Sequence, residues 1–79
     1  MPVVLRVGPY QFQFFASHRT EPAHIHVRRE RRKAKFWLEP AISLARNERF
    51  APHELNELRR LVGKNRAFFL EKWHEFFNR

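Results

Sequence analysis

Residues 22–40 read PAHIHVRRERRKAKFWLEP, and this stretch decides the fold. Apolar and polar side chains alternate over residues 24–28 and again over 34–38, which predicts two short β-strands. Residues 29–33 between them contain no glycine, so they are expected to form a mobile hairpin tip. The Glu-Pro pair at 39–40 ends the second strand, because proline cannot donate a hydrogen bond to a strand ladder.

The same alternation precedes this hairpin over residues 3–15. It predicts two half-buried antiparallel strands joined at Gly8 and Pro9. Glycine accepts a positive φ and proline fixes φ at the next corner, so this pair suits a type II′ turn. Residues 16–23 lack periodicity and predict a loop, whereas residues 42–45 are expected to add a short fifth strand.

Downstream, the pattern changes to that of one long amphipathic helix from about residue 52 to 77. Pro52 suits the first helical turn, and Glu54 and Glu57 place negative charge near the helix N-terminus. Gly63 is the position at which this helix would divide in two. The apolar stripe expected to pack on the sheet consists of Leu55, Leu58, Val62, Phe69, Trp73, Phe76 and Phe77.

Leu61 and Phe68 fall on a flank outside that stripe. In one interpretation they contact a partner or a second copy of the chain, forming a homodimer. In the other, the core stripe is simply wider than roughly 100°.

The whole chain, residues 1–79, is therefore predicted to form a single α+β domain. An antiparallel sheet of four to five strands, over about 3–45, would pack against one long C-terminal helix, over about 52–77. The chain has no cysteine, and its N-terminus has no export signal. No stretch approaches the roughly 20 apolar residues of a membrane span. We therefore expect a cytoplasmic protein with no membrane contact.

Positive charge is concentrated in the central hairpin. The net charge is +8, and six of the sixteen lysines and arginines lie within eight positions: Arg28, Arg29, Arg31, Arg32, Lys33 and Lys35. Arginine forks suit the phosphates of a nucleic acid, and Trp37 on the same face would stack an unpaired base. An acidic protein would satisfy the same charges, so both kinds of partner stay open.

His24 and His26 stand two apart on one strand, so their rings are expected on the same side. As an acid and a base, with Lys35 or Arg28 holding the phosphate, they could cleave RNA through its own 2′-hydroxyl. As structural residues, they would cap the sheet by hydrogen bonding to the preceding Glu-Pro loop. As metal ligands, they would need a further donor from among His18, Glu21, Glu39, His53 and His74, and no suitable spacing is present.

No glycine-rich phosphate loop, G-x-S-x-G or H-E-x-x-H occurs, so no cofactor and no metal site is assigned. Several segments together resemble the bacterial family called domain of unknown function 4160. They are Arg6, the aromatic stretch 10–15, Glu21-Pro22, HIHV at 24–27, AKFWLEP at 34–40, Glu54-Leu55 and Trp73. The resemblance implies membership of a toxin-antitoxin module, with a cognate small protein of the uncharacterised family 2442 as antitoxin. Two departures are the basic tip RERRK at 29–33 and Arg49, where glycine would be usual.

These observations lead to two functional hypotheses. In the first, the chain is a toxin that binds and cleaves RNA as a metal-independent endoribonuclease. His24, His26 and Lys35 would then be catalytic, while the arginines, Lys33 and Trp37 bind the RNA. In the second, the same face is a non-catalytic binding module for an acidic partner or DNA, and the histidines are structural.

Overall fold

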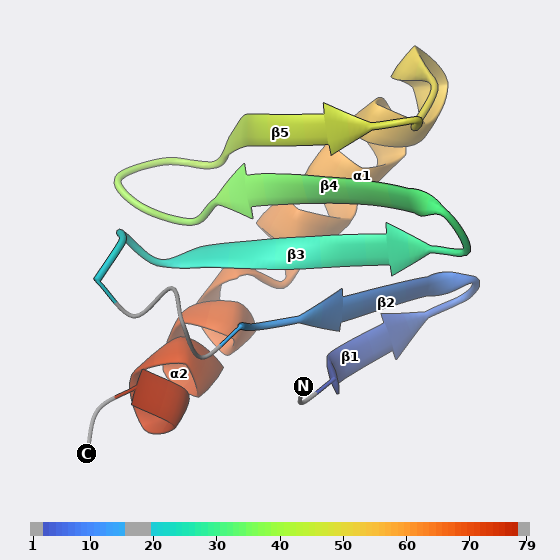
Figure 1. Cartoon of the computed structure of the whole chain (residues 1–79). Coiled ribbons are helices and arrows are strands. Elements are labelled where there is room, and N and C mark those ends of the chain that lie inside the picture. Colours follow the sequence, from blue (N-terminus) through green and yellow to red (C-terminus); the bar gives the residue numbers. More distant parts are fainter. Residues whose placement is uncertain (1–2, 16–19, 78–79) are drawn as a thin grey trace.

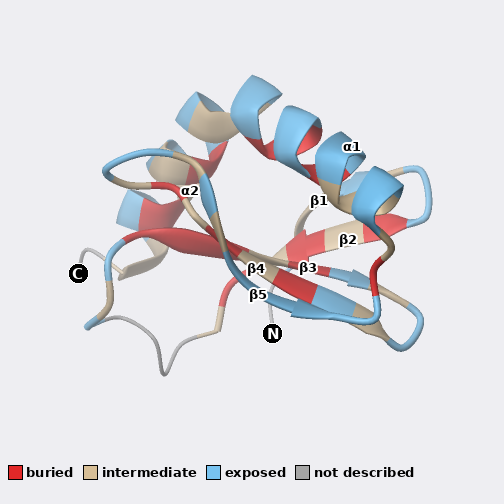
Figure 2. Ribbon diagram, turned by 90° about the horizontal axis from the view of Figure 1, so that it is seen from above, coloured by how far each residue is buried: buried red, intermediate tan, exposed pale blue. Residues whose placement is uncertain are grey.

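The computed structural model describes residues 3–15 and 20–77, which form a five-stranded antiparallel sheet and two helices (Figure 1). The strands lie side by side in chain order. They are β1 (Val3–Val7), β2 (Tyr10–Gln13), β3 (His24–Arg29), β4 (Arg32–Trp37) and β5 (Ser43–Glu48). The helices α1 (Pro52–Lys64) and α2 (Arg66–Phe77) lie on the same face of the sheet (Figure 2). The predicted α+β architecture is confirmed.

The prediction of one long helix was wrong, because the helix is interrupted at Asn65. This residue has φ −106° and ψ 14°, and its side-chain amide donates to the Leu61 carbonyl at 2.9 Å. Gly63, the expected point of division, lies within α1. Arg66 Nε donates to the Leu38 carbonyl at 2.8 Å. This bond ties the start of α2 to the residue that follows β4.

Both hairpins of the N-terminal half close through tight turns. Gly8 has φ 56°, as the type II′ prediction requires. The tip expected to be a mobile loop is instead a two-residue turn, because Arg29 still pairs with Arg32 and Glu30 adopts φ 55°. Arg49 also lies in the left-handed region, at φ 78°, which glycine enters without strain.

The core lies between the sheet and the two helices. Phe12 on β2 contacts Phe69 on α2, with ring centroids 5.3 Å apart, and Phe14 meets Trp73 edge-on at the same distance. Leu61 is only 6% exposed and belongs to this core, so for this residue the interpretation as a wider core stripe holds and the partner-facing flank does not. The apolar stripe of α1 is therefore wider than estimated.

Candidate nucleic-acid interface

One face of the sheet is open. The helices cover the face that carries Ile25, Val27 and Phe36, and in the described part of the chain no helix covers the opposite face (Figure 2). Because strand side chains alternate, β3 presents His26 and Arg28 on this open face. β4 presents Lys33, Lys35 and Trp37, which lie beside them in the ladder.

The fifth strand extends the open face further than expected. The sequence prediction ended the sheet near residue 45, whereas β5 continues to Glu48. Arg46 pairs in register with Lys35, and Glu48 pairs with Lys33, so both side chains join the open face. The alternation of charges at 46 and 48 is the sequence signal that the prediction missed.

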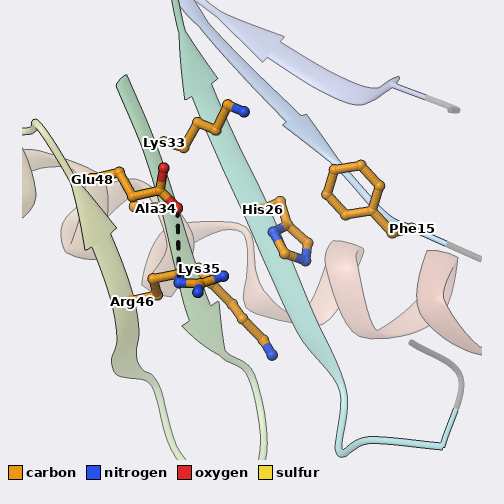
Figure 3. A pocket seen from close by; sticks show the side chains of 7 residues that line it. All are labelled: Phe15, His26, Lys33, Ala34, Lys35, Arg46 and Glu48. Atoms are coloured by element: carbon orange, nitrogen blue, oxygen red, sulfur yellow. Dashed lines mark ion pairs between the residues drawn. The ribbon is translucent and has the colours of Figure 1, made fainter. Parts of the chain in front are cut away.

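Two adjoining hollows lie on this face. One of about 300 Å³ is lined by Phe15, His26, Lys33, Ala34, Lys35, Arg46 and Glu48 (Figure 3). The other, of about 240 Å³, shares Phe15, His26 and Lys33 with the first and also contacts Arg28. We call the two together the basic groove. Its side chains are Phe15, His26, Arg28, Lys33, Lys35, Arg46 and Glu48.

Lys35 is held firmly at one end of the groove. Its ammonium forms an ion pair with the Glu21 carboxylate at 2.5 Å and lies 4.5 Å from the centre of the Trp37 ring. The Lys35 side chain is only 15% exposed. Lys35 is thus partly neutralised, and it covers the Trp37 ring that was expected to stack a base.

The two histidines lie on the same side of β3, as predicted, with ring centroids 5.1 Å apart. Their surroundings differ. His24 is completely buried, and its ring contacts Trp73 of α2 at 4.9 Å. His26 is half-buried and meets Phe15 edge-on at 4.3 Å. Only His26 therefore lines the groove.

His24 closes the loop before β3. Its Nδ1 lies 2.9 Å from the Pro22 carbonyl, and since a carbonyl only accepts hydrogen bonds, Nδ1 carries the proton. The Glu21 carboxylate lies 3.8 Å from the same nitrogen. This is the bond to the Glu-Pro loop that the structural interpretation of the histidines expected.

The basic hairpin is divided between the two faces of the sheet. Arg29 and Arg32 point toward the helices, and the Nη1 atom of each lies 3.5 Å from Glu54 Oε2. Arg29 also lies over the Tyr10 ring, 5.8 Å from its centre. Arg31 is exposed at the tip. Among the hairpin cations expected to bind nucleic acid, Arg28 and Lys33 therefore line the groove. Arg29 and Arg32 instead form ion pairs with Glu54 of α1.

Glu54 links this hairpin to the start of α1. Its Oε1 accepts a hydrogen bond from the Ala51 amide at 3.0 Å, and its side chain is 12% exposed. The Ala51 hydrogen bond, followed by the charges of Arg32 and Arg29, lowers the pKa of Glu54 below its ordinary value of 4.5. The carboxylate therefore stabilises the folded chain at neutral pH. That contribution is lost as the pH falls from about 4.5 through the folded pKa.

We therefore expect Glu54→Gln to lower the urea midpoint of unfolding at pH 7 and to have a much smaller effect at pH 3. The comparison checks whether the ionised carboxylate is the stabilising group. Glu57→Gln on the same helix is the control. The Glu57 side chain is 53% exposed, and its ion pair with Arg60 Nη2 is long, at 3.9 Å, so it contributes little to stability. An equal loss for Glu54→Gln at both pH values would show that charge is not involved.

Other predicted positions lie apart from the groove. Phe68 is 37% exposed, and the Lys72 ammonium lies 5.6 Å from its ring centre, so its role as a partner contact stays a prediction. His53 and His74 are exposed on the helices. His18, considered as a metal donor, lies outside the described residues. Within residues 3–15 and 20–77, no three potential metal-binding side chains come together.

The described helices are also too short or too polar to cross a lipid bilayer. The fold and the groove define a small α+β domain with helices on one face of its sheet and a cationic groove on the other. The chain belongs to the family described as domain of unknown function (DUF4160), whose model matches residues 10–74. This match includes every residue of the basic groove. No curated protein and no solved structure matches the chain.

Proposed function

We propose that the protein binds RNA through the basic groove, as the toxin-side member of a bacterial toxin-antitoxin pair. The observation that supports this proposal is the convergence of Arg28, Lys33, Lys35 and Arg46 on one open sheet face. Cations placed in a row on a sheet suit a phosphate backbone, whose counterions are released on binding. Phe15 and His26 line one side of this groove, and we propose that an unpaired base stacks beside them.

We further propose that the histidine pair supports binding rather than cleavage. Acid-base cleavage by two imidazoles requires both rings to reach the phosphodiester. His24 has no exposed surface, and its Nδ1 is committed to the Pro22 carbonyl. His26 alone lines the groove, which suits contact with RNA better than a two-residue proton transfer.

The toxin-side role implies a cognate small protein as antitoxin. The net charge of +8 favours an acidic partner, and the groove is where cations of the open face gather. We propose that the partner covers this groove, so that the partner and RNA compete for one site. A partner that binds without reducing RNA affinity would contradict this part of the proposal.

Fluorescence anisotropy with a labelled single-stranded RNA, at several salt concentrations, tests the binding proposal. If Arg28, Lys33 and Arg46 each contact one phosphate, the logarithm of the binding constant should fall against the logarithm of salt with a slope of about −2. The RNA should be recovered intact. Absence of binding at micromolar protein overturns the RNA proposal, and tighter binding of duplex DNA of the same sequence favours the DNA alternative.

A further inference from the structure

We infer that the basic groove reads a guanine in single-stranded RNA, with the Glu48 carboxylate accepting hydrogen bonds from the base; the inference rests on the proposed function. It concerns the one acidic side chain among the residues that define the groove. A groove that binds phosphate should attract the RNA backbone, but a carboxylate within it repels that backbone. Its presence therefore points to a ligand group that donates hydrogen bonds.

Glu48 is placed so that it can exchange its ion pair with Arg46 for hydrogen bonds from a ligand. It lies opposite Lys33 in the ladder, and its Oε2 is 3.7 Å from Arg46 Nε. The Glu48 and Arg46 side chains are 50% and 73% exposed, so this ion pair contributes little to stability. A ligand that donates hydrogen bonds to Glu48 and offers phosphate to Arg46 would satisfy both groups at once.

The bases differ in what they offer a carboxylate. The Watson-Crick edge of guanine presents two adjacent N–H donors, N1–H and the N2 amino group, which match the two oxygens of a carboxylate. Adenine and cytosine each present an amino group beside an acceptor nitrogen, and uracil presents one N–H between two carbonyl oxygens. The unmatched acceptors repel a carboxylate, so guanine is the base that Glu48 should select.

The shape of the groove fits an unstacked base. Figure 3 shows Arg46 and Glu48 on β5 at one side, His26 and Phe15 at the other, and Lys33 and Lys35 between them. A volume of about 300 Å³ is at the small end for a ligand site and suits one nucleotide. The Watson-Crick edge is free only in an unpaired base, so the RNA must be single-stranded.

Anisotropy with the labelled heptanucleotides UUUGUUU, UUUAUUU, UUUCUUU and UUUUUUU tests the inference. For the wild type we expect the guanine strand to bind at least about 10-fold more tightly than the other three. Glu48→Ala should reduce this preference to about 2-fold and should raise the affinity for UUUUUUU, because a negative charge is removed from the groove. The matched control is Glu57→Ala, which removes an exposed carboxylate from α1 and should keep the preference.

A second measurement needs no variant. Guanosine 5′-monophosphate and uridine 5′-monophosphate are compared as competitors of UUUGUUU on the wild type. The concentration that displaces half of the bound strand should be about 10-fold lower for guanosine 5′-monophosphate. Equal binding of the four strands overturns the inference while the proposed function stands. A guanine preference that survives Glu48→Ala also overturns it. If no strand binds, the proposed function itself fails.

Discussion

Replacing Arg28 and Lys33 together by glutamate is expected to weaken RNA binding by about 100-fold. Each side chain is exposed on the groove, and a charge-assisted hydrogen bond to phosphate contributes about 1.5 kcal/mol. Two such bonds amount to about 3 kcal/mol, which is about 100-fold in affinity. The salt slope should become shallower by about 1.4, because two phosphate contacts are lost. Anisotropy titrations at several salt concentrations measure both effects.

This double variant keeps one cross-strand charge relation and changes another. Arg28 and Lys33 are direct partners across β3 and β4, so like charges face each other before and after the substitution, whereas Lys33→Glu also places a second carboxylate opposite Glu48. The unfolding midpoint of the variant is therefore measured beside its RNA affinity. The control is Arg59→Glu with Arg60→Glu, on exposed positions of α1, which makes the same change in net charge. If the control weakens RNA binding as much, overall charge and not the groove determines affinity.

Phe69→Ala is expected to lower the free energy of unfolding by about 3 to 5 kcal/mol. Phe69 has no exposed surface and packs on Phe12, so truncation leaves a cavity between α2 and the sheet. A domain of this length has a total stability of about 4 to 12 kcal/mol. The variant should therefore melt about 15 to 30 °C below the wild type. Urea unfolding followed by tryptophan fluorescence measures the loss.

The adjacent residue offers a matched control. Phe68→Ala removes the same ring from a position that is 37% exposed, and it should cost about 1 kcal/mol or less. Similar losses for the two variants would contradict the placement of α2 on the sheet. Because Phe68→Ala keeps the fold, it also tests the partner-contact prediction: partner affinity should fall while the unfolding midpoint changes little.

Much of the fold could be predicted because its elements have distinct periods. Alternation over residues 3–15, 24–28 and 34–38 located four strands, and the helical stripe located the C-terminal third. The helix break could not be predicted in the same way. It lies at Asn65 and is accompanied by the bond from Arg66 to the Leu38 carbonyl, which joins residues far apart in the chain.

The site was predicted less completely. Pleating correctly placed His24 and His26 on one side of β3, but the burial of His24 depends on Trp73, which arrives from α2. Because residues 29–33 were predicted to be a loop, the face of the sheet on which each arginine lies could not be predicted from the sequence. With a two-residue turn, Arg29 belongs to β3, and strand alternation places its side chain on the helix-covered face, as it does Val27. There Arg29 forms an ion pair with Glu54.

The order of the strands has a consequence for synthesis on the ribosome. Each strand pairs with the one made just before it, so every contact within the sheet closes a short loop and can form early. The aromatic residues Phe12 and Phe14 gain their contacts with Phe69 and Trp73 only when α2 emerges. During that interval the nascent chain presents a bare aromatic surface, which is where a chaperone would engage it.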